Sequence, residues 1–212
     1  AELELTQRIQ MHFPRGILSE VELNRWNGCS ANILTTVLEV TFGHGASPEA
    51  HKIDPRFSLL TTFQFTVPKD YVHQTQLASF AKENREKFYS YNDNITDANF
   101  AKATNKLIPG KTYEVKIFGI IKRVTSENCL SFLKTQNAIL VGAQGISVVW
   151  QQIRGEFPKG KYTVSFDEKD TLWRGAYDSH GVPDVGRGSD GDWYFDLSYF
   201  EVDWGDDDCV LC

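Results

Sequence analysis

The sequence predicts a single domain of the α+β or α/β class, in which about four helices cover a mixed sheet of about six strands. Two observations support this prediction. Strand-like and helix-like patterns follow one another along the chain, most clearly in residues 126–173. In addition, 41% of the 212 residues are hydrophobic and 13% are aromatic, which provides enough apolar surface for a substantial core.

Residues 126–173 give four elements in succession. A helix over 126–136 begins at Ser126, a residue type that caps helix N-termini. The compact apolar run 138–141 predicts a strand, which ends at a glycine-rich turn. Apolar residues at helical spacing then predict a helix over 146–154, and alternating residues predict a strand over 161–166.

The residues before this unit predict five further elements. Alternating or near-continuous apolar residues indicate strands, and charged residues around an apolar stripe indicate helices. Thr96 is a suitable N-cap for the second of these helices. In chain order the elements are strands at 34–42 and 57–67, helices at 75–90 and 97–107, and a strand at 111–124.

The residues after Trp173 have a different composition. The segment 174–192 is rich in glycine, aspartate and serine, which predicts loops and tight turns. Residues 193–204 alternate aromatic and polar side chains, as a strand or hairpin does. Residues 206–212 begin with three aspartates, and we expect them to form a flexible acidic tail on a globular domain of residues 1–205.

The charge distribution disfavours nucleic acid as a partner. Residues 184–212 contain nine acidic residues and one arginine, a sum of −8, so the remaining 183 residues carry +2 of the total of −6. Phosphate backbones are bound by clustered lysine and arginine, and neither part has such a cluster. No run of eighteen apolar residues predicts a membrane span, and four scattered cysteines without a disulfide framework indicate a cytoplasmic protein.

The C-terminal aromatic residues are the first candidate binding site. Aromatic rings interspersed with aspartates can stack against a sugar or peptide while carboxylates accept its hydrogen bonds. The alternative is that many of these rings belong to the core. The candidates are Trp173, Tyr177, Trp193, Tyr194, Tyr199 and Trp204.

A second candidate is catalytic. Asp167, Glu168 and Lys169 follow the strand predicted at 161–166. Metal-dependent nucleases place an acid and, two residues later, a lysine at such a strand end, which is the spacing of Asp167 and Lys169. There the acid holds Mg²⁺ and the lysine stabilises developing charge. The run 138–141 supplies no partner acid, and a charged strand end explains the same residues without catalysis.

Three further motifs have weaker functional interpretations. Asp190, Asp192 and Asp196 have oxygen ligands that suit Ca²⁺, although Asp-Gly is also a hairpin turn and the EF-hand spacing is absent. The turn Gly142–Gly145 before a helix resembles an anion site without matching a phosphate-binding motif. Cys209 and Cys212 are half of a zinc site or a prenylation box, and the aspartates upstream oppose membrane attachment. We predict no cofactor, with Mg²⁺ or Ca²⁺ as the alternative.

Several segments resemble one group of proteins. They are FSLLTTFQFTVPKDYVHQTQL, ITDANFAKATNKLIPGKTYEVKIF, ILVGAQGISVVWQQ, PKGKYTVSFDEKDTLW, SDGDW and CVLC. Together they resemble a group of small uncharacterised proteins of reduced-genome, candidate-phylum bacteria, from about Leu38 onward. The resemblance implies a bacterial, cytoplasmic setting and no particular activity.

The sequence therefore favours a soluble, non-enzymatic binding protein that uses an aromatic and acidic C-terminal surface. Its partner is a protein, a peptide or a carbohydrate. The competing hypothesis is a metal-dependent phosphoryl-transfer or nuclease-like enzyme centred on Asp167, Glu168 and Lys169.

Overall fold

The computed structural model describes residues 54–212. The strand predicted at 34–42 lies outside them. The described residues form one mixed sheet of eight strands with three α-helices, so the α+β class is confirmed. The strands are β1 (Phe57–Thr66), β2 (Ser90–Tyr91), β3 (Thr112–Ile120), β4 (Lys161–Val164), β5 (Trp173–Arg174), β6 (His180–Arg187), β7 (Trp193–Tyr199) and β8 (Asp208–Leu211).

The α-helices are α4 (Gln76–Asn84), α5 (Ser126–Thr135) and α6 (Gly142–Ile153). Short 3₁₀ turns accompany them at His73–Thr75, Arg85–Lys87, Arg154–Glu156, Lys169–Thr171 and Ala176–Asp178.

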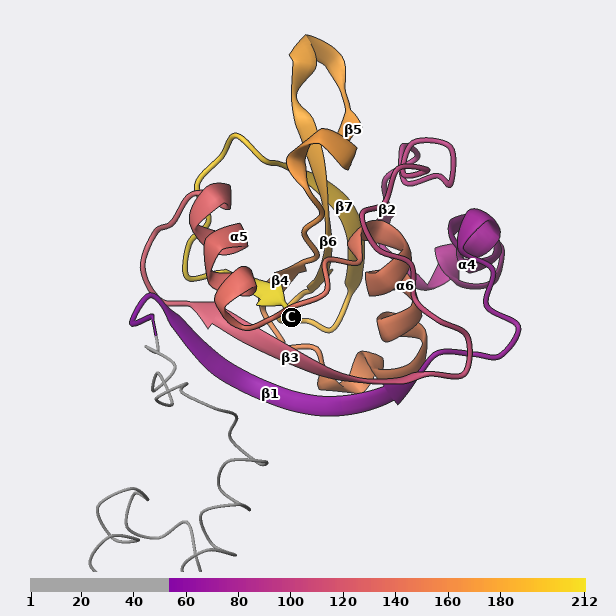
Figure 1. The fold of residues 1–212 in the computed structure, drawn as a ribbon, viewed down its shortest axis with the longest axis horizontal. Helices are drawn as coiled ribbons and strands as arrows, with labels where there is room; N and C mark the ends of the chain where they lie inside the picture. The colour runs from indigo at the N-terminus through magenta and orange to yellow at the C-terminus, as the bar shows by residue number, and fades with distance from the viewer. Residues whose placement is uncertain (1–53) are drawn as a thin grey trace, which may run out of the picture. The chain divides into compact units, whose positions relative to one another are not determined.

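The strand order in the sheet is β1-β3-β8-β4-β6-β7-β2, with β5 paired to β6 outside this path. The β4–β8 and β2–β7 pairs are parallel, and the other pairs are antiparallel. Helix α6 contacts both β1 and β6, strands from different parts of this order, so the sheet curves around it. Figure 1 shows α5 near the C-terminal end of β3 and α6 near its N-terminal end.

The two faces of the sheet carry separate apolar clusters. One face packs against α4 and α6 through residues such as Phe65, Val115 and Val185. The other face packs against α5, with Phe118 and Val210 among its residues. We call these the α6 face and the α5 face.

A β-bulge places the two ends of β1 on different faces. Phe57 belongs to the α5 cluster and stacks on Phe132 at 4.0 Å between ring centroids, whereas Phe65 belongs to the α6 cluster. Without a bulge, residues separated by an even number would share a face. The register shift between Leu59 and Thr61 reverses the alternation, so β1 contributes to both cores.

Helix α5 begins one residue earlier than its capping pattern predicts. Thr125 is the N-cap, and its hydroxyl accepts a hydrogen bond from the Asn128 amide at 3.3 Å. Ser126 instead lies inside the core, where its hydroxyl donates to the Phe200 carbonyl at 2.6 Å and accepts from Trp204 Nε1 at 2.8 Å. The serine therefore joins α5 to the segment after β7.

The helix predicted at 97–107 is wrong, because this segment forms turns. The Asp97 carboxylate accepts hydrogen bonds from the amides of Leu77 and Ala78, at the start of α4. Asp97 thus satisfies two amides that a helix leaves unpaired at its N-terminus. The helix predicted at 75–90 is shorter than expected and ends in a 3₁₀ turn at Lys87.

The strand predicted at 138–141 is also wrong. Among residues 54–212 this segment pairs with no strand. Its hydrogen bonds run from the Ala138 amide to the Leu133 carbonyl, from Asn105 Nδ2 to the Leu140 carbonyl and from the Gly145 amide to the Val141 carbonyl. Its apolar side chains pack against both clusters, which accounts for the run of hydrophobic residues.

The C-terminal residues are part of the sheet. We expect a flexible tail at 206–212 from the aspartates, yet β8 lies between β3 and β4, and the side chains of Cys209 and Val210 are buried. The segment 174–192, predicted to be loop, contains β6 near the middle of the sheet. In both segments the burial of apolar side chains stabilises a strand and outweighs the low strand propensity of glycine and aspartate.

Candidate functional site

Two tyrosines on the α5 face lie at the same level of the sheet. Tyr162 of β4 pairs in register with Gly186 of β6, and Gly186 pairs with Tyr194 of β7. Residues paired in register point to the same face, so the two rings lie on either side of a glycine. Their centroids are 6.4 Å apart.

Gly186 is required for this arrangement. A Cβ atom built on it would lie 2.6 Å from Cδ1 of Tyr162, closer than real side chains approach. The Tyr162 ring therefore leans over the glycine toward Tyr194.

Tyr89 adds a third ring. Its centroid lies 5.7 Å from that of Tyr194, and its amide donates to the Trp193 carbonyl at 2.8 Å. Tyr89 is 77% exposed and Tyr162 is 43% exposed, whereas most aromatic side chains in the described part of this fold are buried. We call Tyr89, Tyr162 and Tyr194 the tyrosine row.

Aspartates surround the tyrosine row. Asp208 pairs in register with Tyr162, and Asp196 lies two residues after Tyr194 on the same face. Partial desolvation, together with the negative charges of Asp190 and Asp192, raises the pKa of the Tyr194 phenol. The phenol is therefore close to these carboxylates in the β6–β7 hairpin.

The basic residues of the same strands point the other way. Lys161 pairs in register with Arg187, and both alternate with the residues of the tyrosine row. The Arg187 guanidinium lies 5.4 Å from the Trp193 ring and donates to the Phe157 carbonyl at 3.1 Å, on the α6 face. Strands β4, β6, β7 and β8 consequently direct acidic side chains, but no lysine or arginine side chain, to the α5 face.

Asp184 is the most strongly perturbed acid of this region. It lies opposite Asp196 in the β6–β7 ladder and is only 2% exposed. Burial, reinforced by the charges of Asp196 and Asp208, raises its pKa to about 7, although a hydrogen bond from Ser198 acts in the opposite direction. Asp196 accepts hydrogen bonds from Asn92 Nδ2 at 2.7 Å and from the Leu197 amide at 2.8 Å.

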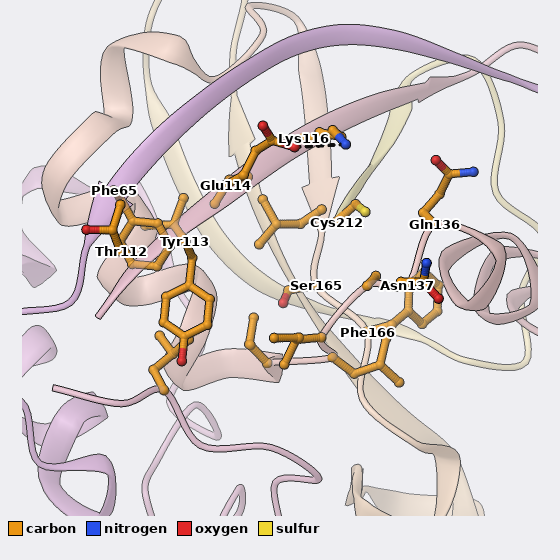
Figure 2. Close-up of a pocket in the computed structure, with 18 residues that line it drawn as sticks. Phe65, Thr112, Tyr113, Glu114, Lys116, Gln136, Asn137, Ser165, Phe166 and Cys212 are labelled. Atoms are coloured by element: carbon orange, nitrogen blue, oxygen red, sulfur yellow. Dashed lines mark ion pairs between the residues drawn. The ribbon is translucent and has the colours of Figure 1, made fainter. Parts of the chain in front are cut away.

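A cavity of about 320 Å³ lies at the other end of β8. Its walls come from β3, from residues 136–141, and from Ser165 and Phe166. Figure 2 shows Tyr113 and Asn137 on opposite sides of the cavity, with Ser165 between them in this view. The Glu114 carboxylate and the Lys116 ammonium, 2.9 Å apart, also line it.

The structure separates the six aromatic residues that the sequence groups together. Tyr194 alone among them lies in the tyrosine row. Trp204 is 2% exposed and is part of the core. Trp173 and Trp193 pack against the α6 cluster, whereas Tyr177 and Tyr199 are exposed.

Two members of the tyrosine row, Tyr89 and Tyr162, are missed by sequence reasoning. Tyr162 alternates with Val164, which is typical of an inward-facing strand residue. Only the register with Gly186 reveals that it lies beyond the part of the sheet that α5 covers.

Asp167, Glu168 and Lys169 do not converge. Asp167 is buried, and its carboxylate accepts hydrogen bonds from the amides of Thr104 at 3.0 Å and Glu168 at 2.9 Å. Burial is the main reason why its pKa is raised. The Lys169 ammonium lies 3.3 Å from Oε1 of Glu201 instead.

Asp167 also lies at the turn predicted as an anion site. Gly142 has a φ of 52°, in the left-handed region, and a Cβ there would lie 3.1 Å from Oδ2 of Asp167. The N-terminus of α6 thus has a carboxylate of the protein itself beside it, which suits the positive end of a helix.

The candidate metal ligands are dispersed. Asp190 and Asp192 lie in the β6–β7 hairpin, and Asp196 Oδ1 is held by the hydrogen bonds described above. Cys209 is buried on the α6 face, whereas Cys212, three residues later, points to the opposite face. Among residues 54–212, no group of three or more His, Cys, Asp or Glu side chains could hold a metal ion.

No helix in the described part of the chain is long and apolar enough to cross a membrane. No family model, curated protein or solved structure matches the sequence. The sheet, the helices and the surface described above define the protein as an α+β domain with a curved mixed sheet and an exposed tyrosine row bordered by aspartates.

Proposed function

We propose that this protein is a non-enzymatic binding protein whose tyrosine row takes a peptide segment that carries lysine or arginine. The observation that carries the proposal is the arrangement of Tyr162, Gly186 and Tyr194 in one register row, with aspartates on both sides. The strands of this region direct no lysine or arginine side chain to the same face.

Both the tyrosine rings and the surrounding aspartates favour a ligand with a cationic side chain. An ammonium or guanidinium group over an aromatic ring gains about 0.5–1 kcal/mol at an exposed site. The carboxylates of Asp190, Asp192, Asp196 and Asp208 add attraction that salt screens. Several such contacts along one peptide combine into moderate affinity, and the negative field accelerates association.

A carbohydrate is the competing ligand. Sugar rings stack on tyrosines, and Asp196 and Asn92 offer hydrogen-bonding groups beside the row. Neutral sugars carry no positive charge, so the concentration of aspartates on this face favours the cationic peptide. The two ligands also differ in their dependence on salt.

The test is calorimetric titration with an oligolysine peptide at low and at high ionic strength. We expect binding at low salt that weakens as salt is added. Replacing Tyr194 by alanine should reduce the affinity roughly threefold to tenfold, the effect of one to two cation–π contacts. Tyr177→Ala is the matched control, because Tyr177 is exposed in a different hairpin.

Three results would overturn the proposal. They are the absence of oligolysine binding, equal effects of the two tyrosine substitutions, and salt-independent binding of a chito-oligosaccharide in place of the peptide. A metal-dependent hydrolytic activity lost in Asp167→Ala and Lys169→Ala would support the nuclease-like alternative instead.

A further inference from the structure

Asp184 lies beside the tyrosine row on the α5 face. It comes two residues before Gly186 on β6, so both residues point to the same face. Positions two apart along a strand are separated by roughly 6.6 Å. Tyr162 and Tyr194 flank Gly186, so β6 itself places no side chain between the two rings and Asp184. A cation held between the rings is therefore one same-face strand position away from this carboxyl group.

The other same-face neighbours of Asp184 enclose it. Val164 pairs with it on β4, and Val182 precedes it by two residues on β6; both valines are completely buried. On β7 it lies opposite Asp196. The remaining side is that of Gly186. The carboxyl group is thus enclosed by apolar side chains and another acid, and its fourth side faces the tyrosine row.

The acidic groups around Asp184 favour its neutral form. Asp196 on β7 and Asp208 on β8 are negative and oppose its ionisation. Ser198 acts in the opposite direction through hydrogen bonds, one of which is donated by its hydroxyl at 2.9 Å. The phenols of the tyrosine row supply no positive charge. Ionisation of Asp184 therefore costs free energy in the unbound protein.

The basic groups of the same strands are directed elsewhere. His180 comes four residues before Asp184 on the same face, and its Nδ1 lies 2.8 Å from Oε1 of Glu201. Lys161 and Arg187 belong to the α6 face. Within residues 54–212, no lysine, arginine or histidine contributes to the ionisation of Asp184. A positive charge on a ligand would supply what these residues lack.

We propose that Asp184 is the buried counter-charge of the tyrosine row and gives up its proton to the solvent when a cationic side chain binds between Tyr162 and Tyr194. This inference rests on the proposed function and adds its regulation by pH. The positive charge of the ligand favours the ionised carboxylate, which in turn attracts the ligand. Since the lysine or arginine of the ligand keeps its own charge, one proton leaves the complex and none is taken up.

The direction of the pH dependence follows from this exchange. In the free protein the pKa of Asp184 is about 7, mainly because of burial. A bound cation lowers this pKa, so the affinity is lowest where the free protein is protonated and rises as pH increases toward 8. A lowering by one pKa unit corresponds to a tenfold gain in affinity. The site therefore releases its ligand in mildly acidic surroundings.

Calorimetric titration of the full chain with an oligolysine peptide blocked at both ends tests the proton release. The block is needed because a free α-amino group titrates between pH 7 and 8, whereas lysine side chains stay charged there. Titrations at pH 6.5 in two buffers of different ionisation enthalpy count the protons. For a pKa lowered by about one unit, the wild type should release roughly half a proton, and its affinity should rise roughly fivefold to tenfold from pH 5.5 to pH 8.

Three variants identify the titrating group. Asp184→Asn keeps an acceptor for Ser198, should release no proton at pH 6.5 and should bind the peptide equally at pH 5.5 and pH 8. Asp170→Asn, which removes an exposed carboxylate outside the tyrosine row, should keep the wild-type proton release. Ser198→Ala removes a hydrogen bond to the ionised form, so the rise in affinity should move to higher pH.

The outcomes separate this inference from the function on which it rests. Salt-sensitive peptide binding without proton release in the wild type would overturn the inference and leave the proposed function intact. Proton release that persists in Asp184→Asn would do the same, because another acid would then be its source. Absence of peptide binding at both pH values would overturn the two together. Circular dichroism at pH 5.5 and pH 8 verifies that each variant is folded.

Discussion

The Ser198 hydroxyl on β7 donates a hydrogen bond of 2.9 Å to the carboxylate of Asp184 on β6. This carboxylate is almost completely buried, and two other aspartates lie close enough to oppose its ionisation. One neutral donor compensates only part of the cost of a buried charge. The protein therefore carries an acid whose protonation responds to pH near neutrality.

Replacing Asp184 by asparagine should flatten the pH dependence of stability. The pKa of Asp184 is about 7 in the folded protein and about 4 in an unfolded chain. Between these values the folded state holds a proton that the unfolded state has lost, so the free energy of unfolding falls as pH rises. The fall is on the order of 4 kcal/mol and is complete above pH 7.

Urea denaturation of both proteins at pH 5 and pH 8 measures this effect. Because the amide oxygen of an asparagine side chain accepts the Ser198 hydrogen bond without a charge, the Asp184→Asn variant should be more stable than the wild type at pH 8. A wild-type protein whose stability did not fall between the two pH values would contradict the assignment.

Substituting Val210 by aspartate should abolish folding. Val210 is completely buried in β8 between β3 and β4, so a charge there has no solvent and no partner. Val202→Asp is the control, because Val202 is an exposed valine after β7 and should tolerate the change within about 0.5 kcal/mol. Circular dichroism and thermal denaturation distinguish these outcomes from the behaviour of a flexible tail, for which both variants would fold normally.

Asp167→Ala should destabilise the fold by about 1–3 kcal/mol, because it removes the acceptor for the Thr104 and Glu168 amides. Asp170→Ala, three residues away at an exposed position, should change the free energy of unfolding by less than about 0.5 kcal/mol. The midpoint of urea denaturation measures both. Equal midpoints for the two variants would show that the hydrogen bonds of Asp167 to the Thr104 and Glu168 amides do not stabilise the fold.

Gly186→Ala should disturb the tyrosine row with little effect on folding. The new Cβ displaces the Tyr162 ring, which is partly exposed and free to move. Loss of the glycine also restricts the unfolded chain, so the net change in stability should stay within about 1 kcal/mol. Ring-proton chemical shifts of Tyr162 and Tyr194 report the displacement, and unchanged shifts would show that the rings do not depend on the glycine.

In a Cys29→Ser background, Cys212 should react with a thiol reagent before Cys129 and Cys209. Burial raises the pKa of Cys129 and of Cys209 to about 12, and both side chains are inaccessible. Cys212 is partly exposed and lines the cavity. Mass spectrometry of the labelled peptides at pH 8 identifies the order, and early modification of Cys209 would indicate that β8 opens readily.

Periodicity predicted the elements that depend on local pattern. Strands β1, β3, β4 and β7 and helix α5 lie where alternation or helical spacing places them, within a few residues. The burial pattern of each of these elements is visible in its own sequence, because a strand buries every second side chain and a helix buries every third or fourth. The α+β class follows from them.

The predictions that were wrong depend on tertiary contacts instead. The apolar run 138–141 lines a cavity and does not pair as a strand, and a run of apolar residues in the sequence looks the same in both cases. Strand β6 contains Pro183, which disfavours a strand, but Pro183 lies just beyond Val164–Asp184, the last pair of the β4–β6 ladder. The Pro183 carbonyl accepts a hydrogen bond from the Ser165 amide at 2.9 Å, so the missing amide also faces β4, and its loss costs the sheet one hydrogen bond at the end of that ladder.

The candidate sites were still harder to predict. The tyrosine row depends on the register of β4 with β6, two strands that are not consecutive in the chain, and on Tyr89, which lies far earlier in the sequence. No local pattern encodes that register. The sequence offered Tyr194 and the C-terminal aspartates as candidates, whereas the neighbours of Tyr194 in the row came from tertiary pairing.

The position of β8 also affects how the protein is made. Strands β1 and β3 form one part of the sheet and β4, β6, β7 and β2 form the other, with β8 as the strand that hydrogen-bonds to both. A ribosome synthesises all of these strands before it reaches Asp208–Leu211. Until that segment emerges, the nascent chain holds two incomplete half-sheets, each with an exposed edge on which chaperones or other chains can act.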